Sequence, residues 1–186
     1  MTDRLRPPHL SSRRRLIAGA GVAALGVAAG CTNAGSNPPR GGSIDDVALL
    51  NNVLGLEYEV GGAYDAALAA GALRTADAAL ARAFQADHAK HAEALVRAIT
   101  RLQGKSVTAR ADYRFDVDAL RQRDDALRFL LGFEQGLALT HLGAVPAFAD
   151  KSLAKGAAGI LGIETMHWSA LRSALGENPV PAPFLG

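Results

Sequence analysis

Four long segments of this chain carry apolar side chains that recur every three or four residues, and this periodicity constrains the fold more than any other feature. The spacing is typical of helices that bury one face. It predicts helices over residues 44–70, 74–103, 117–148 and 151–175. No segment shows the clear alternation of a strand, so we expect an all-α fold.

The connections predict how the four helices are joined. Gly71, Gly104 and Gly176 each follow a predicted helix and are typical of helix ends. The stretch from Gly104 to Asp116 is the longest connection and would span about 40 Å when extended, roughly the length of a 27–30-residue helix. It is long enough to cross the bundle and join two helical hairpins. We expect Pro146 to kink the third helix near its end or to stop it early.

Each predicted apolar face is interrupted near mid-length by side chains of the kind that bind metal ions. These are Glu57 on the first helix, His88 and His91 on the second, Glu134 on the third, and Glu164 and His167 on the fourth. Residues equidistant from the turn of a helical hairpin lie at the same height. The midpoints between Glu57 and the two histidines of the second helix lie near residue 73, beside the turn at Gly71. The midpoints between Glu134 and the two ligands of the fourth helix lie near residues 149–150, on the predicted turn there. We therefore expect all six at one level of the core.

Three carboxylates in one core need compensation. An unpaired buried carboxylate costs several kcal/mol, and carboxylates that converge also repel one another. A divalent cation is the simplest partner, and imidazole with carboxylate suits iron, manganese or zinc better than copper. The single cysteine and two methionines offer no sulfur-rich alternative. The competing interpretation is a polar core closed by its own hydrogen bonds.

This pattern resembles the ferritin-like superfamily, in which two helices supply one Glu each and two others supply a Glu-x-x-His motif each. Glu57 and Glu134 match the single glutamates. Glu164-Thr165-Met166-His167 matches one motif, and His88-Ala89-Lys90-His91 occupies the place of the other. Tyr64 sits where relatives such as rubrerythrins often have a tyrosine, so the resemblance implies that it is a hydrogen-bond donor or an electron source beside the metal. The implied fold is a ferritin-like four-helix bundle of two hairpins.

The second helix departs from that pattern. His88 stands where a glutamate normally bridges two metal ions, and histidine has no pair of oxygens with which to bridge. The neighbouring Asp87 is about 100° away around the helix and would need a local adjustment to replace it. A site for one ion, or an asymmetric site for two, therefore competes with the usual dimetal centre. His141 lies roughly 10 Å beyond Glu134 along the same helix, so we expect a supporting or structural role for it.

The resemblance implies a redox metalloprotein that uses iron or manganese to handle oxygen, peroxide or ferrous iron, with zinc as a third candidate metal. The alternative is a non-catalytic structural or partner-binding bundle with a degenerate metal site. Both an iron- or manganese-dependent oxidoreductase and a protein that is no enzyme are compatible with these residues. A homo-oligomer is compatible as well.

The first thirty residues read as an export signal. Arg13-Arg14 precede a Gly/Ala-rich apolar run, which resembles the twin-arginine signal of bacteria; an ordinary secretion signal is the alternative. Ala28-Ala29-Gly30-Cys31 resembles a lipoprotein cleavage box, so lipidation of Cys31 and simple cleavage both stay open. We expect an exported protein, periplasmic or in the cell envelope, either free or tethered to the membrane through Cys31.

The rest of the chain divides into three parts. Residues 31–43 are rich in Asn, Gly, Ser and Pro and predict a flexible linker, residues 44–176 form the bundle, and residues 177–186 form an extended Pro-rich tail. The first thirty residues hold five Arg and one Asp, so the remainder has 15 basic and 17 acidic residues. The remainder therefore has a net charge near −2. Nucleic-acid binding needs an excess of basic residues on one face, so this charge argues against nucleic acid as a partner.

Glycine is unusually common within the predicted helices. Gly55, Gly61 and Gly62 lie in the first, and Gly132 and Gly136 flank Glu134 in the third. Each costs about 1 kcal/mol relative to alanine in a helix interior, so we expect a compensating role. Close helix–helix packing is the favoured explanation, and space beside a metal for oxygen, peroxide or water is the alternative.

Overall fold

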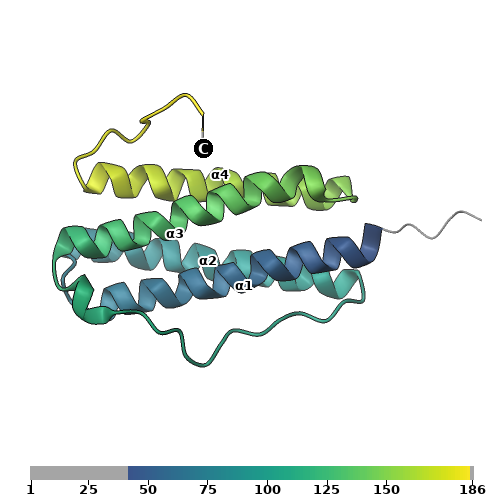
Figure 1. Cartoon of the computed structure of the whole chain (residues 1–186), viewed down its shortest axis with the longest axis horizontal. Coiled ribbons are helices and arrows are strands. Elements are labelled where there is room, and N and C mark those ends of the chain that lie inside the picture. The colour runs from purple at the N-terminus through teal and green to yellow at the C-terminus, as the bar shows by residue number, and fades with distance from the viewer. Residues whose placement is uncertain (1–41, 185–186) are drawn as a thin grey trace, which may run out of the picture. The chain divides into compact units, whose positions relative to one another are not determined.

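Four helices make up most of the computed structural model, which describes residues 42–184 (Figure 1). They are α1 (Gly42–Ala69), α2 (Thr75–Arg101), α3 (Arg123–Ala144) and α4 (Lys151–Ala174), with short 3-10 helices η1 (Val117–Leu120) and η2 (Val145–Ala147). No strand occurs within residues 42–184. The predicted all-α bundle is confirmed.

The helices form two hairpins, as predicted. α1 packs against α2, and α3 packs against α4. The two hairpins meet mainly where α1 contacts α3, whereas α2 and α4 share little contact. The chain between α2 and α3 runs along the length of the first hairpin before it enters η1 (Figure 1). This is the crossover that the length of the connection predicted.

The third helix is shorter than the predicted range 117–148. Asp116 accepts a hydrogen bond from the Ala119 backbone N–H and caps η1, and the chain is extended at Gln122 before α3 begins. At the other end α3 stops at Ala144, and Pro146 lies within η2. Proline has no backbone N–H to continue the helical ladder, so of the two expected outcomes the early stop is the observed one.

The predicted helix-ending glycines mark the ends of their helices. Gly71 and Gly176 adopt left-handed φ angles of 70° and 73° just after α1 and α4. After α2 it is Gln103 that takes the left-handed angle, with φ 58°. The following Gly104 is needed for space, because a Cβ there would lie 2.7 Å from Cγ1 of Val47.

The expected packing role of the other glycines is wrong at four of the five positions. A Cβ on Gly55, Gly61, Gly132 or Gly136 would meet no atom of the described chain within 4 Å outside its own helix. Gly62 differs, because a Cβ there would lie 2.8 Å from Cδ2 of Tyr113. The partner of Gly62 is therefore the crossover and not a neighbouring helix.

Two hydrophobic clusters fill the bundle, one toward each end. The first includes Leu54, Leu95 and Ile99, and the second includes Leu127 and Leu130. The buried glutamates and histidines of the core lie between them. This arrangement confines the polar layer to mid-bundle and keeps it from water on both sides along the axis.

Two buried aspartates fix opposite ends of the bundle. The carboxylate of Asp77 accepts hydrogen bonds from Nε and one terminal nitrogen of Arg123, at 2.6 and 3.0 Å. The same terminal nitrogen donates to the carbonyl oxygen of Ala174, so this pair ties α2, α3 and α4 together. At the other end, Asp46 of α1 accepts hydrogen bonds from the backbone N–H groups of Ala149 and Asp150, in the turn before α4.

The remaining sequence predictions concern the ends of the chain. The signal, Cys31 and most of the linker lie outside the described residues, and α1 already includes Gly42 and Ser43. The described tail, residues 177–184, contains no helix and turns back over α4 (Figure 1). None of the helices within residues 42–184 is both long enough and apolar enough to cross a membrane.

Candidate metal centre

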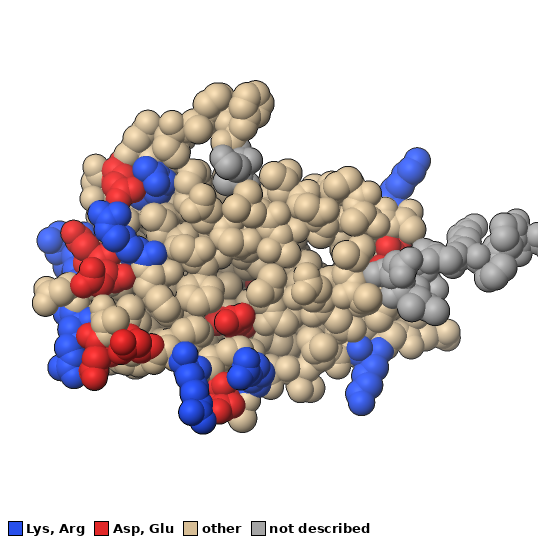
Figure 2. All heavy atoms as spheres, in the orientation of Figure 1, with Lys and Arg blue, Asp and Glu red and all other residues tan. Residues whose placement is uncertain are grey.

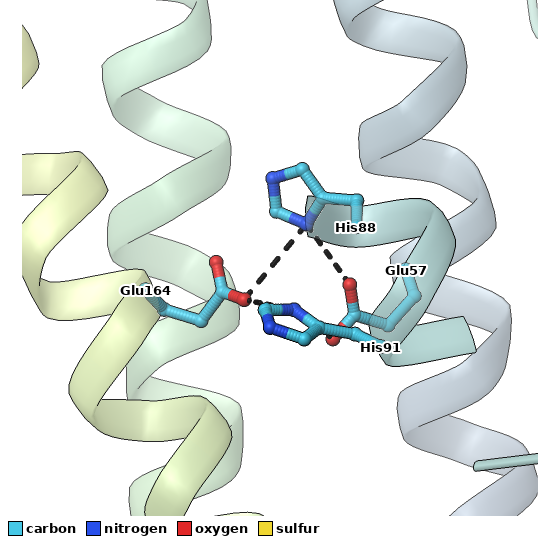
Figure 3. Close-up of side chains that lie close together, drawn as sticks. All are labelled: Glu57, His88, His91 and Glu164. Carbon is cyan, nitrogen blue, oxygen red and sulfur yellow. Dashed lines mark hydrogen bonds and ion pairs between the residues drawn. The ribbon is translucent and has the colours of Figure 1, made fainter. Parts of the chain in front are cut away.

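The structure brings the six predicted ligands together at mid-bundle. Their side chains come from all four helices, and five of the six are buried with relative exposures of 0–3%. The sixth, His91, has a side chain that is 13% exposed and lies at the edge toward α4. Figure 3 shows four of these residues pointing toward one another. The positions of these residues on the apolar helix faces and the midpoints of the hairpins therefore predicted that the six side chains lie close together.

His88 lies at the centre of the cluster. Its Nδ1 is 2.9 Å from Oε2 of Glu57, and its Nε2 is 3.0 Å from Oε1 of Glu134. Both ring nitrogens are thus engaged by carboxylates from two different helices. The position that would hold a bridging glutamate in the expected pattern here holds a ring that links the two single glutamates.

Two overlapping groups of ligand atoms surround His88. One comprises Glu57, His88, His91 and Glu164, and the other comprises His88, Glu134, Glu164 and His167. Within each group the ligand atoms lie within 4.8 Å of one another. Glu164 belongs to both groups, with Oε1 2.8 Å from Nδ1 of His91 and Oε2 3.7 Å from Nδ1 of His167. Glu164 is therefore the one carboxylate placed to face both sides.

Several of these buried atoms have no hydrogen-bond partner. Among the described residues, this holds for both carboxylate oxygens of Glu164, for Oε2 of Glu134 and for Nδ1 of His91 and His167. The 2.8 Å contact between His91 and Glu164 lacks the geometry of a hydrogen bond. Unsatisfied buried acceptors and donors are rare and costly. Nitrogen and oxygen atoms that converge in this way fit a divalent cation such as iron, manganese or zinc.

The charges of the cluster are tightly coupled. Burial works to raise the pKa of Glu57 and Glu134, but hydrogen bonds from histidines outweigh it and lower both, that of Glu134 to about 2. Burial likewise works to lower the pKa of the histidines, but the close carboxylates of Glu57, Glu134 and Glu164 raise it, to about 10 for His88 and about 9 for His91 and His167. Without a metal the cluster is thus a network of carboxylates and imidazolium ions.

Tyr64 lies in the place that the resemblance implied for it. Its side chain is fully buried, and its hydroxyl donates a hydrogen bond to Oε1 of Glu134. Burial first, and then the charge of Glu134, raise the pKa of Tyr64 well above 10. The phenol therefore stays protonated and holds one oxygen of Glu134, which leaves the other oxygen for a second partner.

Three neighbours of the cluster contribute contacts that the sequence did not reveal. His141, expected only as a supporting residue, places Nε2 3.4 Å from Oε1 of Glu57. The ring of Phe84 stacks on His167 with centroids 3.9 Å apart, and Oδ2 of Asp87 lies 3.6 Å from Nε2 of the same histidine. His141 follows Glu134 by two helical turns, so its place on the buried stripe was the available signal.

Known proteins share the fold of this chain. The model of the ferritin-like domain family matches residues 45–177, which is most of the chain. The chain belongs to the ferritin-like family. A crystal structure of a conserved hypothetical protein from Mycobacterium tuberculosis has a similar fold, with a TM-score of 0.66, 18% sequence identity, and coverage of 76% of this chain and 97% of that one. No curated protein matches the sequence.

Within the ferritin-like family, this bundle combines the expected hairpins with a buried His/Glu cluster compatible with metal binding. His88 belongs to both ligand groups of the cluster. Because both of its ring nitrogens contact glutamates, the cluster divides into one half around His91 and another around His167.

Proposed function

We propose that this ferritin-like protein is an exported metal-binding protein that holds iron or manganese in its core for redox chemistry with oxygen, peroxide or ferrous iron. The observation that carries the proposal is the set of buried ligand atoms without hydrogen-bond partners, which converge from α2, α3 and α4. A closed network of internal hydrogen bonds would leave no such atoms.

The chain's own residues divide the work in this proposal. Glu164 faces both halves of the cluster, His91 and Glu57 complete one half, and His167 and Glu134 complete the other. Iron or manganese bound here would supply one-electron redox chemistry. Tyr64 holds Glu134 in place through its hydroxyl, and His141 does the same for Glu57. The two hydrophobic clusters exclude water along the bundle axis.

One observation favours the alternative of a non-catalytic bundle. His88 is satisfied on both sides by Glu57 and Glu134, so the centre of the cluster is stable without a metal. A metal would compete with protons for the imidazoles, because each raised histidine pKa means a proton that must leave before the nitrogen can bind. The alternative then describes a structural or partner-binding bundle with a degenerate site.

Metal content separates the two functions. We expect protein purified from its native host to carry about one iron or manganese ion per chain, and Glu164→Ala and His167→Ala variants to carry at least about tenfold less. Glu93→Ala is the matched control, because Glu93 lies on α2 but is exposed and pairs with Arg97. Thermal melting followed by circular dichroism checks that each variant is folded.

Two outcomes would contradict the proposal: little metal in the parent protein, or metal unchanged in the Glu164 and His167 variants. A His88→Glu variant extends the test, because it restores the second carboxylate that a dimetal centre uses. We expect it to raise the metal content toward two ions per chain. Oxygen or peroxide turnover by the metal-loaded protein then distinguishes an oxidoreductase from a binding protein.

A further inference from the structure

A cavity of ligand-binding size lies on the outer side of the first hairpin. It is an open groove with a volume of about 920 Å³, lined by α1, α2 and residues 109–113 of the crossover. Its lining includes Glu57 and His88, so its floor reaches the candidate metal centre. Binding sites for small molecules typically measure about 300–1,000 Å³. We call this cavity the crossover groove.

The crossover forms the outer wall because it is attached at two points and arches between them. Near its start, the amide of Asn51 donates to the carbonyl oxygen of Lys105 at 2.9 Å and accepts from the backbone N–H of Val107 at 2.7 Å. Near its end, Tyr113 packs over Gly62 and stacks on Phe115, with ring centroids 6.2 Å apart. Residues 108–112, between these attachments, are all exposed.

Gly61 and Gly62 have different relations to this groove. A Cβ on Gly62 would collide with Tyr113, so that glycine lets the crossover approach α1. A Cβ on Gly61 would meet nothing within 4 Å, so that glycine contributes open space on the groove side of Glu57. Gly61 thus leaves space in the groove, and Gly62 lets the crossover approach α1 and form the wall of the groove. The packing hypothesis included neither role.

The walls combine flat aromatic surfaces with positive charge. Tyr58 and Tyr113 line the groove together with small residues of α2. Three arginines lie at its rim, of which Arg97 pairs with Glu93, whereas Arg110 sits over the Tyr113 ring at 5.6 Å. Within residues 46–184, no carboxylate lies within 4 Å of the guanidinium of Arg82 or Arg110.

Each acidic residue of the lining has a partner other than Arg82 or Arg110. Asp65 accepts a hydrogen bond from the Gln85 amide at 2.7 Å, and Glu93 is held by Arg97. Glu57 is engaged by His88 below the floor. Arg82 donates a hydrogen bond to the carbonyl oxygen of Ala78 at 3.3 Å, but neither its guanidinium nor that of Arg110 is paired with a carboxylate of the described chain. A guanidinium binds a carboxylate through two parallel hydrogen bonds, so both arginines are candidates to hold an anionic ligand.

We propose that the crossover groove binds a small planar aromatic molecule with a carboxylate or similar anionic group. Its ring lies in the groove beside Tyr58 and the edge of Tyr113, its anionic group meets Arg82 and Arg110, and its inner edge approaches Glu57 and His88. This deepens the proposed function and rests on it for the role of substrate, because only a metal in the core would make the bound molecule react. Binding itself needs no metal.

Calorimetric titration with 2-naphthoate tests the binding site. We expect saturable binding of one molecule per chain in the wild-type protein. Ala86→Trp should weaken it at least about tenfold, because Ala86 is an exposed residue of α2 that lines the groove and a large ring there fills the cavity. Ala94→Trp is the matched control, since Ala94 is equally exposed on α2 but does not line the groove. It should bind like the wild type.

The charge of the ligand is tested separately. Arg82→Met should weaken 2-naphthoate about tenfold and leave the neutral 2-naphthalenemethanol unchanged. No saturable binding of 2-naphthoate, or equal binding by wild type and Ala86→Trp, would overturn the proposal. Equal affinity for the neutral compound would overturn the assignment of an anion.

Titrating the same protein with and without its metal keeps the two proposals apart. If the purified protein contains metal but does not bind 2-naphthoate, the groove proposal fails and the proposed function stands. If it lacks metal but binds 2-naphthoate as predicted, the groove stands and the proposed function fails.

Discussion

A single histidine gives this cluster its particular character. His88 stands where the resemblance implied a bridging glutamate, and its two ring nitrogens contact Glu57 and Glu134. Its raised pKa places a positive charge among the buried carboxylates. In the proposed function, the same residue would therefore compensate the carboxylates of the metal-free core and compete with a second ion for them.

The raised and lowered pKa values predict how the stability of the metal-free protein depends on pH. The histidines have pKa values of about 9–10 in the fold and about 6.5 when unfolded, so their contribution is complete below pH 6.5 and is lost as pH rises through 9–10. The pKa of Glu134 is about 2 in place of 4.5, so its contribution is complete above pH 4.5 and is lost as pH falls toward 2.

We therefore expect the metal-free protein to be most stable between about pH 4.5 and 6.5. Urea denaturation should give a higher midpoint at pH 5.5 than at pH 9.5. The difference should shrink in His88→Gln, which keeps a polar side chain but cannot carry the charge. A midpoint that rises steadily from pH 5.5 to pH 9.5 would show that the histidines are neutral in the fold.

At this scale the sequence predicted which residues meet but not how they bond. Helical periodicity and hairpin midpoints were enough to predict that Glu57, Glu134 and Glu164 lie at one level of the bundle. They could not predict that His88 would turn both nitrogens to carboxylates, because that depends on rotamers and on the spacing of α1 and α3. The contact of His141 with Glu57 depends in the same way on the distance between these two helices.

At the scale of single helices, local sequence determines some helix ends, whereas other features depend on what packs beside the helix. Pro146 stopped α3 early, as one of the two expected outcomes had it. The start of α3 was missed, since the apolar periodicity continues through residues 117–122 and conceals the break after η1. The glycine content of the helices was explained wrongly because sequence alone does not show what lies beside a glycine.

The exposed glycines predict that the helices can be made more stable. Gly132 of α3 is exposed, and a Cβ there would meet nothing within 4 Å, so Gly132→Ala should raise the free energy of unfolding by about 0.5–1 kcal/mol. Gly62→Ala is the contrasting variant on α1 and should lower it, because the new Cβ would collide with Tyr113. Guanidinium denaturation measures both. A gain in Gly62→Ala as large as that in Gly132→Ala would show that the crossover does not rest on α1.

On the scale of the whole molecule, charge is unevenly distributed. Figure 2 shows Lys, Arg, Asp and Glu gathered toward one end of the bundle, whereas the middle of the face formed by α3 and α4 shows none in this view. The two ionisable residues between positions 129 and 149, Glu134 and His141, are both buried. Such a surface is compatible with contact between copies of the chain, and the expected homo-oligomer stays a prediction.

Export also stays a prediction at this scale, and it can be tested directly. Replacing Arg13 and Arg14 by lysine should keep the protein in the cytoplasm if the twin-arginine pathway carries it, and cell fractionation with an antibody measures this. Cys31→Ser should release the exported protein from the membrane fraction if Cys31 is lipidated. Unchanged export of the lysine variant would instead indicate the ordinary secretion pathway.

The crossover has a consequence for the order in which this protein can be assembled. It separates the ligands into two sets of three: Glu57, His88 and His91 belong to the first hairpin, and Glu134, Glu164 and His167 belong to the second. During synthesis the first hairpin emerges with only half of the site, and the last ligand follows near the end of the chain. Neither half can hold the complete centre, so a metal ion would favour the docked bundle over its separated halves. Capture of the ion would then mark the completion of folding.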